Sequence, residues 1–109
     1  FTYVTDVVGQ LVALAEDPGA VGEVFNVGND REEITILELA ERVKARAGSK
    51  STIELVPYDR AYEEGFEDMQ RRVPDLSKLR DLTGYEPLVH LDEILDRVIA
   101  YFTSDATRL

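Results

Sequence analysis

Apolar side chains recur at helical spacing early in the chain. Between residues 5 and 17 they are Val7, Val8, Leu11, Val12, Leu14 and Ala15. This spacing predicts an amphipathic helix, which we expect to begin with Thr5 or Asp6 as its N-cap and to end at Asp17-Pro18-Gly19. Gly9 inside this helix costs about 1 kcal/mol relative to alanine, and we expect a closely packed neighbour to be the reason for it.

A second helix is predicted from its capping chemistry. Thr35-Ile36-Leu37-Glu38 is a capping box, in which the hydroxyl and the carboxylate satisfy backbone donors at the helix start. Apolar residues follow at helical spacing, and Gly48 is suited to end the helix because glycine adopts the left-handed conformation at low cost. The acidic residues Asp30, Glu32 and Glu33 precede this start, where the helix dipole favours negative charge, so we expect them to be structural.

Two further helices are predicted in the second half of the chain. A short one covers residues 76–83, with Asp75 as its N-cap and Gly84 as its C-terminal cap. Its inward-facing residues are Leu76, Leu79 and Leu82. The last helix covers residues 91–102, whose apolar side chains again lie three or four apart. His90 stands at its start, and we interpret it as a capping or surface histidine because no nucleophile lies near it in the sequence.

Three short segments have the β-branched and aromatic composition of strands: residues 1–4, 23–27 and 52–56. Pro57 ends the third segment because proline cannot donate to a strand ladder. We therefore expect an α/β fold with about four helices and two or three short strands.

Residues 62–75 follow neither a helical nor a strand period. A glycine, two adjacent arginines and a proline among aromatic and acidic residues indicate a loop of fixed path that aims side chains at a ligand. Arg71 and Arg72 offer planar guanidinium groups that suit a phosphate or carboxylate, and Phe66 offers a flat face for a base or sugar. The alternative is that both arginines form ordinary ion pairs, which composition alone favours in a chain with 22 acidic residues.

Composition narrows the range of functions. A chain of 109 residues with 44% hydrophobic content can form a folded core. Its net charge of −10 argues against binding nucleic acid or an anionic membrane, because repulsion would oppose both. With no cysteine and a single histidine, neither a disulfide nor a zinc site is expected. No apolar run approaches the roughly 20 residues of a membrane span, so we expect a soluble, cytoplasmic protein.

Several short motifs occur in the order found in one known family. They are Phe1-Thr2-Tyr3-Val4-Thr5-Asp6-Val7-Val8, Val24-Phe25-Asn26-Val27-Gly28, Gly65-Phe66-Glu67-Asp68, Arg71-Arg72-Val73-Pro74-Asp75, Ser77-Lys78 and Gly84-Tyr85-Glu86-Pro87. Together they resemble the C-terminal part of the extended short-chain dehydrogenases/reductases, which are NAD-dependent nucleotide-sugar epimerases, dehydratases and decarboxylases. The resemblance covers nearly the whole chain, and the start at Phe1 without a methionine fits a cut within a longer protein.

The resemblance implies a C-terminal fragment of an extended Rossmann-type enzyme. Residues 1–50 would pack on a cofactor domain, with residues 23–27 as an edge strand, and residues 51–109 would bind the nucleotide-sugar. The family holds NAD with a Gly-x-x-Gly-x-x-Gly loop and uses a Tyr-x-x-x-Lys pair as base, and this sequence contains neither. We therefore expect NAD to bind the full-length parent but not this chain, which should be inactive alone and contain no catalytic residue.

The resemblance also assigns a role to the arginine loop. Arg72 matches an arginine that binds the nucleotide diphosphate or, in decarboxylases, acts near the departing carboxylate, while Arg71 is the weaker candidate and Phe66 matches an aromatic position near the ligand. The implied partner is a UDP- or dTDP-linked sugar, and the implied parent is a homodimer, with UDP-sugar 4-epimerase or UDP-glucuronate decarboxylase as its reaction. The alternative is a non-catalytic nucleotide-sugar-binding or oligomerisation module. The sugar, the base and the reaction type stay open.

Overall fold

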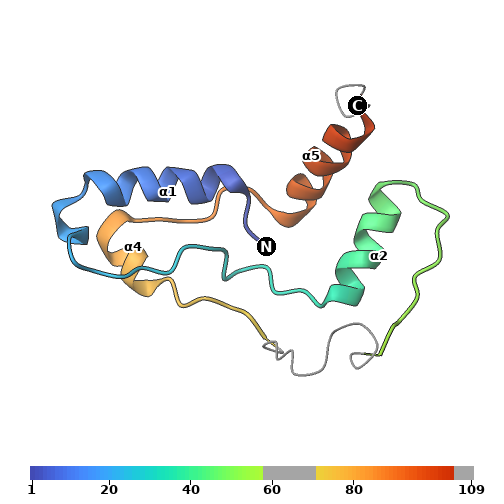
Figure 1. The fold of residues 1–109 in the computed structure, drawn as a ribbon, viewed down its shortest axis with the longest axis horizontal. Coiled ribbons are helices and arrows are strands. Elements are labelled where there is room, and N and C mark those ends of the chain that lie inside the picture. The colour runs from blue at the N-terminus through green and yellow to red at the C-terminus, as the bar shows by residue number, and fades with distance from the viewer. Residues whose placement is uncertain (58–70, 105–109) are drawn as a thin grey trace. The chain divides into compact units, whose positions relative to one another are not determined.

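The computed structural model describes residues 1–57 and 71–104, and these divide into two compact units. Unit 1 comprises Phe1–Glu33 and Val73–Leu109, and unit 2 comprises Ile34–Arg72. In unit 1 lie α1 (Val4–Glu16), the 3-10 helix η1 (Pro18–Ala20), α4 (Ser77–Thr83) and α5 (Leu91–Thr103). Unit 2 contains α2 (Ile36–Arg46) (Figure 1). The described residues thus bear out the prediction of about four helices.

The core of unit 1 is built around α4. Leu76 and Leu79 are each only 1% exposed, and Tyr85 packs with them. The partly buried side chains that cover this cluster are Leu14, Phe25 and Val27. Residues 21–33 and the segment that joins α4 to α5 both run back from this core in the direction opposite to α1 (Figure 1). The short helix therefore joins segments that are far apart in the sequence.

The start of α1 differs from the prediction, whereas its end agrees with it. The helix begins at Val4 with Tyr3 in the N-cap position and no side-chain cap, so the expectation of a Thr5 or Asp6 cap is wrong. Asp6 lies inside the first turn and is buried. After Glu16 the chain enters η1, whose first turn is capped by the Asp17 side chain accepting from the amide of Gly19.

One side of α1 is apolar and exposed. Val4, Val8, Leu11 and Val12 are each at least half exposed, and their spacing places them on neighbouring turns of one helix face. A Cβ atom added at Gly9 would have no neighbour within 4 Å. The expected close neighbour at Gly9 is therefore absent from the described residues.

No helix among those described has the length and apolar composition needed to cross a membrane.

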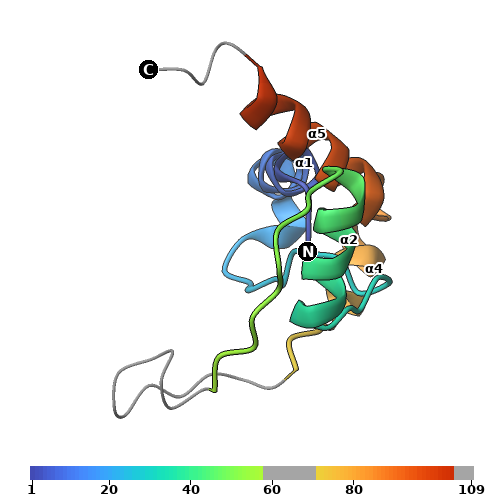
Figure 2. The ribbon, with the colours of Figure 1, turned by 90° about the vertical axis from the view of Figure 1, so that its right-hand side faces the viewer.

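The second helix has the predicted start. The Thr35 hydroxyl accepts from the amide of Glu38 at 3.1 Å, and the Glu38 carboxylate accepts from the amide of Thr35 at 2.9 Å, which completes the capping box. Gly48 follows the helix with a left-handed φ of 61°. Figure 2 shows that the extended chain after α2 runs back in the opposite direction to the helix.

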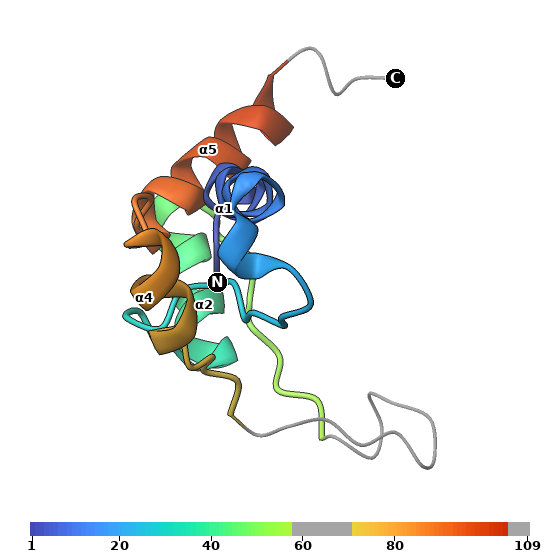
Figure 3. The ribbon, with the colours of Figure 1, turned by 90° about the vertical axis from the view of Figure 1, so that its left-hand side faces the viewer.

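The last two helices also follow their local signals. Gly84 caps α4 in the left-handed conformation, as predicted. The predicted Asp75 N-cap is wrong, because the helix begins at Ser77 with Leu76 in the N-cap position; Asp75 Oδ1 instead accepts from the amide of Ser77. Helix α5 begins at Leu91, as predicted, and runs in a different direction from α1, which Figure 3 shows nearly end-on. The Arg97 guanidinium of α5 lies 4.8 Å from the centre of the Tyr3 ring, just before α1.

The predicted strands are not formed in the described part of the chain. Residues 1–3, 23–27 and 52–56 lie outside every helix and strand, and Val4 is helical. Phe25 and Val27 still turn inward while Val24 is 83% exposed, which is the alternation of a strand. Alternation sets the direction of side chains, but a strand also requires a ladder of backbone hydrogen bonds to a neighbouring strand, and none is formed within residues 1–57 and 71–104.

Candidate functional site

Arg71 and Arg72 are the last two residues of unit 2, and both are exposed. Neither side chain is without an interaction partner, so the ion-pair interpretation stays open beside the ligand-binding one. Phe66, the third predicted site residue, lies outside the described residues. A guanidinium at the surface can reach an anion without the cost of burying an unpaired charge.

The chain immediately after Arg72 is held in unit 1 by specific contacts. The Pro74 ring lies against Gly28, where an added Cβ would come within 3.0 Å of Pro74 Cγ. The Asn26 side-chain amide donates to the carbonyl of Asp75 at 3.3 Å. Hydrogen bonds from Ser77 hold the pKa of the Asp75 carboxyl below its usual value. The segment that follows the predicted site therefore has a defined path.

The buried hydroxyl of Tyr85 holds the backbone at Gly28, against which Pro74 packs. Tyr85 is 4% exposed and donates its hydroxyl proton to the carbonyl of Gly28 at 2.8 Å. Burial, with a smaller contribution from the Asp6 carboxylate, raises the pKa of Tyr85. The phenol therefore stays protonated at neutral pH and remains a donor.

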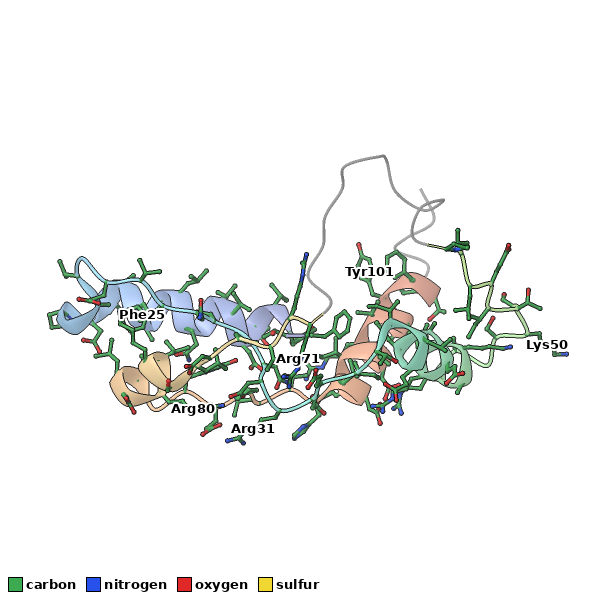
Figure 4. The ribbon with its side chains drawn as sticks, turned by 90° about the horizontal axis from the view of Figure 1, so that it is seen from below. Phe25, Arg31, Lys50, Arg71, Arg80 and Tyr101 are labelled. Carbon is green, nitrogen blue, oxygen red and sulfur yellow. The ribbon has the colours of Figure 1, made fainter. Side chains whose placement is uncertain are left out.

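Arg80 is the centre of an ion-pair network in unit 1. Its two terminal nitrogens donate to the two carboxylate oxygens of Asp30 at 2.6 and 2.7 Å, and its Nε lies 3.4 Å from Glu86 Oε1. Arg31 pairs with Glu86 as well, and Figure 4 shows the two arginines near one another. The paired guanidinium lowers the pKa of Asp30, and Asp30 raises that of Arg80. Because carboxylates already engage it, Arg80 is a structural cation rather than an anion-binding one.

Glu32 links the loop before α2 to the start of α5. Its Oε2 accepts from the amide of Leu91 at 2.8 Å and from the side chain of Asn29 at 3.2 Å. His90 is 77% exposed at its side chain, with Nδ1 3.4 Å from Glu32 Oε1. The acidic residues before α2 thus include structural side chains, as expected, but Glu32 acts on α5 rather than on the dipole of α2. His90 is a surface histidine.

The buried carboxylate of Asp6 was not predicted by the sequence. Its Oδ2 accepts from the amides of Leu88 and Val89 at 3.0 and 3.1 Å. These two donors belong to a segment without regular structure, so the carboxylate replaces the partners that a sheet would supply. Asp6 lies opposite the apolar stripe of the predicted helix, so helical periodicity gave no signal for its burial.

A shallow depression in unit 2 lies between the end of α2 and the chain that follows it. It is lined by Glu41, Lys44, Ala45, Gly48, Ser49 and Ile53. Neither Arg71 nor Arg72 contributes to this lining. The depression therefore adds no support to the predicted site.

The glycines of the described chain do not fit an NAD-binding loop. Gly22, Gly48 and Gly84 have left-handed φ angles, and the last two end helices rather than preceding one. Gly28 follows residues 23–27, and the Pro74 ring fills the space beside it. A dinucleotide pyrophosphate requires free backbone amides at a helix start, and none of these four glycines directly precedes a helix of the described residues.

Comparison with known proteins connects these features to one family. No family model matches the chain. Over 96% of its length it is 40% identical to UDP-glucuronic acid decarboxylase 1 of Danio rerio, and over 94% it is 35% identical to UDP-N-acetyl-alpha-D-glucosaminuronate decarboxylase of Bacillus cytotoxicus. Over 93% it is 31% identical to UDP-D-apiose/UDP-D-xylose synthase 1 of Arabidopsis thaliana.

The match covers a limited part of each relative. The chain spans 23%, 31% and 28% of the lengths of these three proteins. The matched part is the C-terminal portion of these proteins. The chain belongs to the extended short-chain dehydrogenases/reductases, the NAD-dependent epimerase/dehydratase family, and corresponds to the C-terminal portion of these enzymes.

Proposed function

We propose that this chain is the substrate-binding C-terminal part of an NAD-dependent UDP-sugar decarboxylase. The observation that carries the proposal is the 40% identity to a UDP-glucuronic acid decarboxylase across 96% of the chain. A second decarboxylase of a UDP-linked uronate supports the same reaction type. These relatives favour decarboxylation over 4-epimerisation, and a uridine nucleotide over a thymidine one.

Arg72 is proposed to bind the diphosphate or the carboxylate of the substrate. A UDP-linked uronate is strongly anionic, and the chain has a net charge of −10, so the ligand must be held by local donors against an unfavourable long-range field. A guanidinium makes two parallel, charge-assisted hydrogen bonds to phosphate or carboxylate. Arg71 is proposed as a secondary contact and Phe66 as an aromatic neighbour of the nucleotide.

The remaining parts of the proposal concern polypeptide outside this chain. Residues 1–50 are proposed to pack on a cofactor domain that binds NAD and carries the catalytic base, and residues 51–109 to face the nucleotide-sugar. The exposed apolar side of α1 supports this, because such a surface is stabilised when another part of a protein covers it. A homodimeric parent and a cytoplasmic location are further parts of the proposal.

The experiment compares Arg72→Ala with Arg71→Ala in the longer enzyme. Loss of a charge-assisted contact worth about 1.5 to 3 kcal/mol lowers kcat/KM for UDP-glucuronate roughly 10- to 150-fold in Arg72→Ala. The Arg71→Ala variant should lose less, and Arg72→Lys should recover part of the loss because the positive charge is kept. Release of CO2 at varied substrate concentration measures these effects.

Two outcomes would contradict the proposal. Near-wild-type kinetics in both alanine variants would remove Arg72 from the binding site. A longer protein without a Gly-x-x-Gly-x-x-Gly loop and a Tyr-x-x-x-Lys pair upstream would instead select the non-catalytic binding module.

A further inference from the structure

We infer that Gly28 and Tyr85 position the backbone that carries Arg72, so that they set substrate affinity without touching the substrate. This inference rests on the proposed role of Arg72. Neither residue carries a charge, and both lie in the buried part of unit 1. They are positioning residues rather than catalytic ones.

The first step is the contact between Gly28 and Pro74. The backbone of Gly28 has no positive φ, so its conformation is open to any residue and does not explain the glycine. The space around it does, because an added Cβ would lie 3.0 Å from Pro74 Cγ and 3.6 Å from Thr2 Oγ1. Absence of a side chain at position 28 therefore allows the proline ring to seat against the backbone.

The second step is the restraint on Gly28 itself. Tyr85 belongs to the buried cluster with Leu76 and Leu79, and its hydroxyl donates to the Gly28 carbonyl at 2.8 Å. This hydrogen bond fixes the position of the Gly28 backbone relative to the buried cluster. Asn26 adds a second restraint, because its side-chain amide donates to the carbonyl of Asp75, the residue after Pro74.

The third step is the stiffness of the chain between Pro74 and Arg72. The ring of Pro74 fixes its own φ, and the residue before a proline is confined to extended conformations. Val73 is therefore a stiff link between the seated ring and Arg72. A Cβ at position 28 requires the ring to give by a few tenths of an ångström, and this shift moves the start of the arginine side chain. A misplacement of about 1 Å can cost as much as a hundredfold in rate, so we expect a smaller effect here.

The test compares two crowded glycines of the same unit in the longer enzyme. In Gly28→Ala the methyl group displaces Pro74. In the control, Gly19→Ala, the methyl group meets Cδ1 of Leu82, the end of a flexible side chain, at 2.8 Å and does not contact Pro74. We expect KM for UDP-glucuronate to rise on the order of tenfold in Gly28→Ala and to stay unchanged in Gly19→Ala.

Two further variants separate positioning from loss of stability. Tyr85→Phe keeps the buried ring and removes only the bond to Gly28, so we expect a smaller rise in KM; this variant decides the matter if Gly28→Ala does not fold. In the double variant Gly28→Ala/Arg72→Ala, the glycine change should add nothing to the loss caused by Arg72→Ala, because it acts through that arginine.

The outcomes distinguish this inference from the proposed function. If Arg72→Ala impairs kinetics while both Gly28→Ala and Tyr85→Phe keep the KM of Gly19→Ala, the positioning role is overturned and the role of Arg72 stands. Additive effects in the double variant also overturn it. If Arg72→Ala has no effect, the proposed function and this inference fail together.

Discussion

Asp6 is a buried carboxylate that joins α1 to the segment before α5. Its two bonds satisfy the amides of Leu88 and Val89, which lie outside the helices of the described residues. A buried amide without an acceptor costs about 1 to 3 kcal/mol, so the carboxylate stabilises this segment chiefly by preventing that cost. A single side chain therefore holds the segment before α5 against α1.

Replacement of Asp6 by alanine should release that segment. We expect the amides of Leu88 and Val89 to exchange with solvent at least about tenfold faster in Asp6→Ala, because local opening becomes easier by more than about 1.4 kcal/mol. Hydrogen exchange followed by mass spectrometry measures this directly. Asp81→Ala, which removes an exposed carboxylate from α4, is the control, and equal exchange in the two variants would contradict the assigned role.

Helices and strands differed in how far local sequence determined them. The capping box of α2, the end of α1 before Pro18 and the glycine cap of α4 are all formed as predicted, because helix hydrogen bonds and caps join residues close in sequence. The strand segments are not strands, since a ladder requires a second backbone from elsewhere. Local patterns therefore predicted the helices correctly. Of the predicted strands, only the alternation of inward and exposed side chains in residues 23–27 is present.

Two glycines with open surroundings should respond in opposite ways to alanine. Gly9 lies within α1 and Gly84 at the left-handed end of α4, and an added Cβ has no neighbour within 4 Å at either position. Gly9→Ala should stabilise by about 0.5 to 1 kcal/mol, since alanine is the better helix former. Gly84→Ala should destabilise, because its φ of 70° disfavours a side chain.

Thermal denaturation of the 109-residue chain measures this difference. A loss of stability in Gly9→Ala would show that another surface packs closely on α1 at that point. The same pair of variants in the longer enzyme then tests the proposed cofactor-domain contact: a destabilising effect of Gly9→Ala that occurs only there would locate the contact at residue 9.

Unit 1 as a whole combines a small core with carboxylates that are held in their charged form. Hydrogen bonds from Arg80, Lys78 and Ser77 lower the pKa values of Asp30, Glu23 and Asp75, respectively. A carboxyl whose pKa is lower in the folded than in the unfolded chain binds fewer protons when folded. Its stabilising contribution is therefore complete at neutral pH and is lost as pH falls through the folded pKa.

Acid should consequently destabilise unit 1 below about pH 4, where ordinary aspartate and glutamate side chains titrate. In Asp30→Asn the free energy of unfolding should fall less steeply between about pH 4 and pH 2, since one of these linked groups is gone. Urea titrations of the 109-residue chain at several pH values, followed by circular dichroism, give this slope. Glu16→Gln, at the exposed end of α1, is the control, and the same slope in Asp30→Asn as in the unmodified chain would count against the linkage.

The amino-acid sequence by itself determined the helices, the capping box of α2, the glycine cap of α4 and the family, because periodicity, capping pairs and ordered motifs are properties of neighbouring residues. It also indicated Arg71 and Arg72, and the structure places both at the surface. Only the tertiary structure decided the partners of Asp6, Arg80 and Glu32, whose contacts join residues 50 or more positions apart. It also decided that Gly28 seats Pro74. No local pattern encodes such contacts, because they form only when α4 brings distant segments to one core.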